Sequence, residues 1–200
     1  MGIIVFMEAV HNLYDFIINA LGSIGVFAPI LACFLIIIES MIPILPLFVF
    51  ITINFMTFGH IVGFIISWLC TLMGCMISYY LSYKISKKKI EKLKRKQPKI
   101  DLLLNKMKHL SITQIAVVLA IPFTPAFAIN IAAGIVRIPA KKYLLSLVVG
   151  KIFLVYFWGY IGTSLLESIQ NPIIIIKVLI MMSLAFLLSK IVSYIFKIEV

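Results

Sequence analysis

The 200-residue chain is 63% hydrophobic and only 12% charged, and it carries a net charge of +11. Soluble domains are about 45–50% apolar and about 25% charged, so this chain has too few polar side chains to cover a water-facing surface. These proportions exclude a water-soluble globular protein and predict one integral membrane domain over residues 1–200. No basic residue precedes the apolar positions of residues 1–16, so we expect no cleavable signal peptide there.

The N-terminal residues 1–20 are expected to form an amphipathic helix. Its polar residues recur at i, i+3, i+4 and i+7, which places Glu8, His11, Asn12 and Asp15 on one helix face. Such a helix could lie in the membrane interface or span with its polar face toward a bundle. The spacing alone leaves both arrangements open.

Residues 24–83 form the first half of the membrane domain. Residues 24–58, the first broken segment, are apolar but interrupted by a carboxylate and two prolines. Both kinds of interruption are costly in hydrocarbon. Residues 61–83 follow as an uninterrupted span with small residues suited to close helix approach. A turn is expected at residues 59–60.

The positive charge is concentrated in residues 84–108, the basic segment. It holds eleven Lys or Arg against two acidic residues, which leaves only +2 for the rest of the chain. A basic run beside apolar spans predicts a cytoplasmic loop that attracts anionic lipid headgroups. Nucleic-acid binding is not expected, because no aromatic residue interleaves the run and no binding motif is visible.

Residues 109–165 form the second half. Residues 110–136, the second broken segment, are interrupted by "IPFTPAFAIN", and residues 143–163 are again an uninterrupted span. After the turn "ESIQNP", residues 172–196 predict a C-terminal transmembrane helix.

The two broken segments repeat one pattern. "PILPLFVFITINF" and "PFTPAFAINIAAG" both read Pro-x-x-Pro followed by an apolar run that holds an Asn. Paired Pro-interrupted segments in two halves indicate the binding site of a transporter. If residues 84–108 are cytoplasmic, the two segments enter from opposite sides as re-entrant hairpins related by an inverted repeat. Broken backbone at membrane depth is tolerated only in protein or beside water, so we expect a polar cavity between them.

The fold class expected is therefore an all-α integral membrane protein. It combines this inverted repeat of two opposed re-entrant hairpins with about three full transmembrane helices and the N-terminal amphipathic helix.

The order of these motifs resembles the DedA family, also called the VTT-domain or SNARE-associated membrane protein family. The best match is "IPFTPAFAINIAAGIVRIPAKKYLLSLVVGKIFLVYFWGYIG", and the resemblance covers about residues 24–165. It implies two opposed re-entrant hairpins and movement of lipids such as undecaprenyl phosphate or a phospholipid, often with dependence on the proton-motive force. The chain departs from the family pattern because residues 47–58 hold no second acid, and no arginine flanks the second Pro-x-x-Pro.

Glu39 is the first candidate for function, because a carboxylate inside the membrane marks a functional site by default. The structural alternative is a carboxyl capped by Ser40 and freed backbone N–H groups. Arg137 could bind phosphate in bidentate fashion, or only reach lipid phosphates at the cytoplasmic face. Lys151 lies near the middle of the 143–163 span and could neutralise Glu39 across the bundle. The expected substrate or proton site comprises Glu39, Ser40, Pro43, Pro46, Asn54, Pro122, Thr124, Pro125, Asn130 and Arg137.

The leading functional hypothesis is a flippase or scramblase for an anionic or zwitterionic lipid in a bacterial cytoplasmic membrane, as a multi-pass protein. Alternatives are a proton-coupled carrier of small solutes or cationic drugs, and a non-transporting protein of membrane integrity. No hydrolase motif is present, so an enzyme is not expected. Cys33, Cys70 and Cys75 have no clustered His or Asp, so no metal site or cofactor is expected. A homo-oligomer is possible.

Overall fold

The computed structural model describes residues 27–42, 47–85, 90–91, 98–167 and 172–196. The expected amphipathic helix, Pro43, Pro46 and much of the basic segment lie outside the described residues. The described helices are α2 (Ala28–Met41), α3 (Leu47–Tyr83), α5 (Pro98–His109), α6 (Ile112–Ala120), α7 (Ala126–Ile135), α8 (Ala140–Glu167) and α9 (Pro172–Phe196). No strand occurs within these ranges, so the described chain is all-α, as predicted.

Among the described residues, three helices are long and apolar enough to cross a membrane, which agrees with the expectation of about three full transmembrane helices. They are Leu47–Tyr83, Ala140–Leu165 and Ile173–Val192. Large apolar side chains cover their outer surfaces; Ile61 is 77% exposed and Phe153 is 63% exposed. A soluble monomer rarely exposes contiguous apolar surface of this extent, whereas a lipid-facing surface requires it.

The helix α3 contains the turn expected at residues 59–60. Gly59 has φ 75° and ψ 173°, a left-handed conformation that glycine adopts without steric cost. Beyond Gly59 the chain folds back on itself. The close approach is seen at Gly63, where an added Cβ would lie 2.5 Å from the carbonyl oxygen of Asn54. The α3 helix is therefore two arms, and small residues let these arms approach closely.

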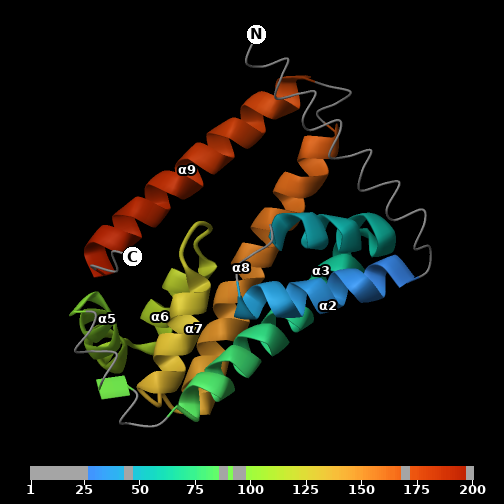
Figure 1. Ribbon diagram of the computed structural model, residues 1–200. Coiled ribbons are helices and arrows are strands. Elements are labelled where there is room, and N and C mark those ends of the chain that lie inside the picture. Colours follow the sequence, from blue (N-terminus) through green and yellow to red (C-terminus); the bar gives the residue numbers. More distant parts are fainter. Residues whose placement is uncertain (1–26, 43–46, 86–89, 92–97, 168–171, 197–200) are drawn as a thin grey trace.

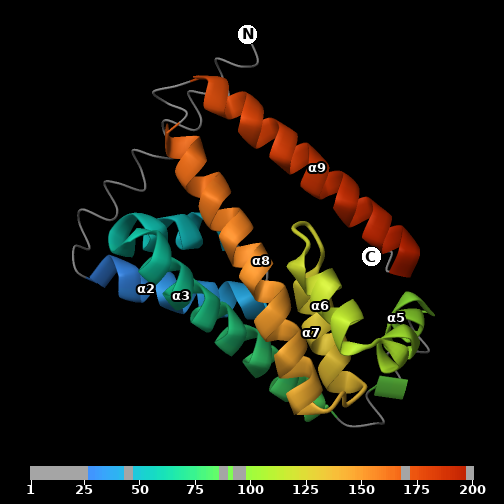
Figure 2. The ribbon, with the colours of Figure 1, turned by 180° about the vertical axis from the view of Figure 1, so that it is seen from behind.

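The helix α8 lies at the centre of the molecule. It packs against α3 on one side and α6 on the other, while α3 also packs against α2 and α7. Figures 1 and 2 show α8 between these two groups of helices, with α9 meeting it near residue 172 and then diverging from it. Each broken segment therefore has its own contact with α8.

The buried apolar residues form two clusters. The small cluster consists of Ile36, Ile51, Phe55 and Val155. The large cluster is built from α3, α5, α6, α7 and α8 and includes Cys75, Leu119, Tyr143 and Leu147. Trp68 packs against both, so it marks the boundary between them.

Part of the basic segment is helical rather than a solvated loop. The helix α5 places Leu104 and Met107 in the large cluster, where each is 1% exposed. Apolar residues three or four positions apart share one helix face, which allows lysines to occupy the other face. The run of lysines concealed this apolar face in the sequence.

Candidate functional site

One face of α8 points into the protein along most of its length. Tyr143, Leu147, Lys151, Val155 and Trp158 recur every three or four residues and therefore lie on one side of the helix. We call these five residues the α8 stripe. The first four are buried and Trp158 is half-buried. The stripe provides a line along which the two broken segments can be located.

At one end of the α8 stripe, hydrogen bonds join both broken segments. The Tyr143 hydroxyl donates to Asn130 Oδ1 at 2.5 Å. Asn130 Nδ2 in turn donates to the backbone carbonyl of Ser40 at 3.2 Å. Asn130 is completely buried, and these two bonds engage its amide oxygen and one of its two N–H donors. This predicted site residue thus links α8, α7 and the end of α2.

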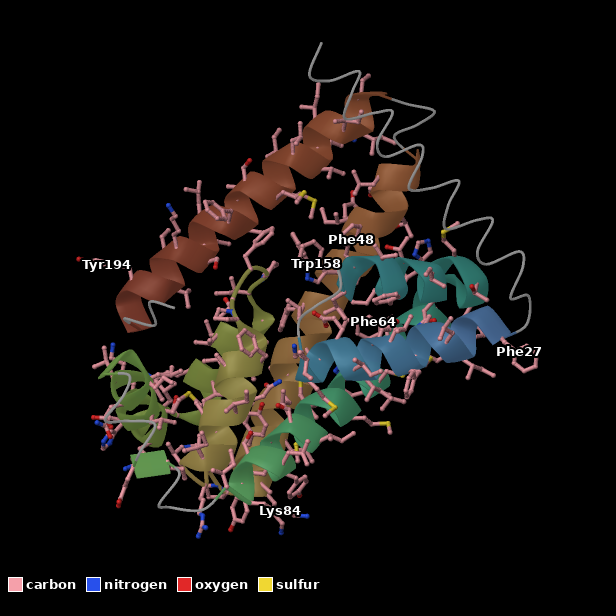
Figure 3. The ribbon with its side chains drawn as sticks, in the orientation of Figure 1. Phe27, Phe48, Phe64, Lys84, Trp158 and Tyr194 are labelled. Atoms are coloured by element: carbon pink, nitrogen blue, oxygen red, sulfur yellow. The ribbon has the colours of Figure 1, made fainter. Side chains whose placement is uncertain are left out.

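At the other end, aromatic rings join the same two segments. Phe48 lies in the first turn of α3, and the centre of its ring lies 5.9 Å from that of the Trp158 ring. Figure 3 shows these two labelled side chains close together. Phe123 lies between Pro122 and Pro125, and its ring lies 5.5 Å from Trp158 in an edge-to-face arrangement. Both broken segments therefore contact Trp158.

Between these ends of the α8 stripe lies the buried charge of Lys151. Lys151 is only 2% exposed, and Glu39 is half-buried one residue before Ser40. The two groups interact electrostatically, as predicted for Lys151. Within the described part of the chain neither makes a direct hydrogen bond or ion pair. A buried ammonium is costly unless an opposite charge offsets it, and Glu39 supplies that charge at a distance.

Three buried side-chain oxygens have no hydrogen-bond partner among the described residues: Ser40 Oγ, Asn54 Oδ1 and Thr124 Oγ1. All three belong to the predicted site. A buried polar group left unpaired costs about 1–3 kcal/mol, so each one requires an explanation. Ser40 and Thr124 come from different broken segments, and each can donate through its hydroxyl.

The amide of Asn54 holds the two arms of α3 together. Its Nδ2 donates to Ser67 Oγ at 3.0 Å and makes a longer contact, 3.9 Å, with Cys33 Sγ of α2. Asn54 and Ser67 are both fully buried. The donor side of this amide is therefore structural, while Oδ1 stays unpaired.

The remaining described residues of the predicted site lie in the loop between α6 and α7 and beyond the far end of α7. Pro122 is buried, and Pro125 caps the start of α7. Arg137 lies exposed on the turn after α7, with its guanidinium 5.1 Å from the centre of the Tyr83 ring. A helix of this length spans about 15 Å, so Arg137 is well separated from Thr124.

The site predicted from the sequence omitted Tyr143, Lys151 and Trp158. The available signal was the spacing of these residues at three or four positions in the 143–163 span, with a lysine among apolar residues. Which helix that face contacts could not be read from the spacing.

A pocket of about 560 Å³ lies between the Gly59 bend and α8. It is lined almost entirely by apolar and aromatic side chains: Phe55, His60, Ile61, Phe64, Ile152, Phe153, Tyr156 and Tyr160. Phe55 also belongs to the small cluster, and Ile152 directly follows Lys151. The pocket therefore lies on the exposed outer side of α8, whereas Lys151 points into the protein.

Comparison with known proteins gives three findings. The family model described as the VTT domain matches residues 42–164. The chain is 30% identical over 173 residues to the uncharacterized membrane protein YhjE of Bacillus subtilis (strain 168), which covers 86% of this chain and 84% of that protein. No solved structure matches significantly. The matched family region begins just before Pro43 and ends after Trp158, so it includes most of the contacts described above.

Proposed function

The chain belongs to the VTT-domain, or DedA, family of membrane proteins, and we propose that it moves lipids with polar headgroups across the membrane. One observation carries this proposal: each broken segment holds a buried, unpaired hydroxyl, and the helix α8 that both segments contact holds the buried Lys151, which interacts electrostatically with the half-buried Glu39. Apolar packing alone does not require such groups at membrane depth. A pathway for a polar headgroup does require polar groups at that depth.

The apolar pocket favours a lipid over a small polar solute. Its volume of about 560 Å³ is within the usual range for ligand pockets. Its lining is apolar, and one lining residue, Ile152, directly follows Lys151 in the chain. A lipid could place its headgroup at the polar residues and an acyl chain in this pocket. A small polar solute would gain nothing from the apolar lining.

We infer further that the broken segments are re-entrant hairpins in an inverted repeat. Two glycines support this. A Cβ on Gly74 would approach the carbonyl of Ile37 and the Cβ of Ser40, which lie six and three residues before Pro43. A Cβ on Gly150 would approach the same atoms of Ala116 and Leu119, which lie six and three residues before Pro122. Equal spacing in both halves is what an internal repeat produces.

The expected orientation completes the proposal. The basic segment is retained on the cytoplasmic side during insertion, and it attracts anionic headgroups at about 1 kcal/mol per nearby basic residue. The protein would then act in the bacterial cytoplasmic membrane as a multi-pass transporter. Membrane lipids are its partners, and a homo-oligomer is compatible with this role.

Reconstitution tests the proposed function. Purified protein in liposomes is given fluorescent phospholipid or polyprenyl-phosphate reporters, and the transbilayer rate is read from quenching of the outer-leaflet reporter. We expect protein-dependent movement of at least one reporter, and a slower rate for a variant with both Ser40→Ala and Thr124→Val. The absence of protein-dependent movement for every reporter would contradict the proposal and favour a non-transporting role in membrane integrity.

A second candidate is a proton-coupled carrier of small solutes or cationic drugs. It is favoured by Glu39, a half-buried carboxylate in an apolar helix that makes no direct ion pair among the described residues. Glu39→Gln should then abolish solute-induced proton flux into liposomes. If the flux is unchanged in this variant, Glu39 does not couple protons and this candidate is removed.

A further inference from the structure

Lys151 is the one buried cation of the described bundle, and neither the family match nor the predicted site assigns it a role. Its side chain is 2% exposed in the middle of α8. Lysine is almost never fully buried without a partner. Among the described residues, however, its ammonium makes no direct hydrogen bond or ion pair. Burying this ammonium without a direct partner costs free energy, so its position requires a reason.

The position of Lys151 follows from its neighbours in the α8 stripe. Leu147, one turn before it, belongs to the large cluster, and Val155, one turn after it, belongs to the small cluster. Lys151 therefore lies at the boundary between the two halves of the core. Glu39 lies at the same boundary, since Ile36 is in the small cluster and the Ser40 carbonyl accepts the hydrogen bond from Asn130.

The two charged side chains are not equally buried. Glu39 is half-buried and acts on Lys151 without direct contact, whereas Lys151 is enclosed. An incoming anion can therefore replace Glu39 as the charge that offsets the ammonium. Without such an anion, Glu39 offsets that charge at a distance.

Two unpaired hydroxyls of the broken segments lie toward opposite ends of the α8 stripe, with Lys151 between these ends. Ser40 adjoins Glu39, and Thr124 adjoins Phe123, whose ring contacts Trp158 two turns along α8. Both hydroxyls are unpaired. The ammonium of Lys151 itself offers three donors to an anion with several acceptor oxygens, which describes a phosphate ester.

We propose that Lys151 is the anion-binding residue of the pathway, where its ammonium takes the phosphate of a lipid headgroup in place of Glu39. This deepens the proposed function and rests on it for the lipid nature of the ligand. The cation absent beside the second Pro-x-x-Pro is thus supplied by α8. Lys151 contacts the substrate, and Glu39 acts as its exchangeable counter-charge.

A binding experiment tests this separately from transport. The purified full chain in detergent is titrated with a short-chain phosphatidylglycerol, and binding is read as the shift in melting temperature. We expect Lys151→Gln to weaken binding at least tenfold and Lys151→Arg to retain most of it, because arginine keeps the charge. Glu39→Gln removes the carboxylate that competes with the lipid phosphate for Lys151, so this variant should bind phosphatidylglycerol more tightly than the wild type does. Lys177→Gln is the matched control, since Lys177 is an exposed lysine in the apolar helix α9.

Unchanged binding in Lys151→Gln, or equal loss in Lys151→Arg and Lys151→Gln, would overturn the assignment. If Lys151→Gln does not fold, the double variant with Glu39→Gln keeps the pair neutral and takes its place. Binding that depends on Lys151 in a protein without lipid transport would keep the site and refute the transport function. Equal binding of inorganic phosphate would keep Lys151 as a phosphate site and refute the lipid headgroup as its specific ligand.

Discussion

Replacing Gly74 with alanine should separate α2 from α3. A Cβ at this position would lie 2.5 Å from the Ile37 carbonyl oxygen and 2.7 Å from the Ser40 Cβ. Ordinary contacts begin near 3.4 Å, so α2 must move by almost 1 Å. The Ile37 carbonyl is backbone within a helix and cannot rotate away, and overpacking of this kind costs about 1–3 kcal/mol. The displaced Ser40 carbonyl would also weaken its hydrogen bond from Asn130.

The assay is thermal unfolding followed by tryptophan fluorescence of the purified chain. Trp68 is a suitable probe because it packs against both clusters and donates a hydrogen bond of 3.2 Å to the Val148 carbonyl. At about 2–4 °C per kcal/mol for a chain of this length, Gly74→Ala should melt about 2–12 °C below the wild type. Met73→Ala is the matched control, since Met73 is 55% exposed on the same helix. Equal melting of Gly74→Ala and Met73→Ala would refute the close approach.

Three other predictions concern the α8 stripe and its neighbours. Tyr143→Phe leaves Asn130 Oδ1 unpaired and should destabilise the protein by about 1–3 kcal/mol in the same unfolding assay; an unchanged melting temperature would contradict the hydrogen-bond network. Ser40→Ala and Thr124→Val should leave stability unchanged or raised, because their hydroxyls are unpaired, while the lipid transport rate falls; a drop in stability would mean that these hydroxyls have structural partners. Trp158→Ala removes two ring contacts between elements, each worth about 0.5–1.5 kcal/mol beyond the apolar area that it buries, and should lower stability by at least their sum; an effect no larger than that of Met73→Ala would argue against them.

Much of the helical framework is predictable from the sequence. Long apolar runs identify the three spans, because crossing a membrane requires a minimum length of apolar helix. Gly59 with His60 marks the turn in α3, since glycine tolerates the positive φ found there. Lys151 could be matched with Glu39 because opposite charges at membrane depth tend to lie together. In each case the prediction depends on neighbouring residues in the sequence or on the signs of two charges, and both can be read without knowing how the helices pack.

The contacts between distant segments are not predictable in this way. The bonds from Tyr143 to Asn130 and from Asn130 to the Ser40 carbonyl depend on how three helices are placed side by side. The chemistry of Arg137 predicts either bidentate phosphate binding or a contact with lipid phosphates at the cytoplasmic face, but the sequence does not show that its turn places the guanidinium over the Tyr83 ring at the far end of α7. Tertiary packing decides both results, and no local pattern in the sequence contains it.

The measurement that tests the central claim most directly uses a single cysteine at position 124. With Cys33, Cys70 and Cys75 replaced by alanine, a Thr124→Cys variant is reconstituted in liposomes, and its lipid transport rate is measured before and after reaction with a bulky water-soluble thiol reagent. If the headgroup passes the buried hydroxyls of the broken segments, the reagent should react and stop transport. Complete reaction with transport continuing at the unlabelled rate would show that the lipid does not pass this site.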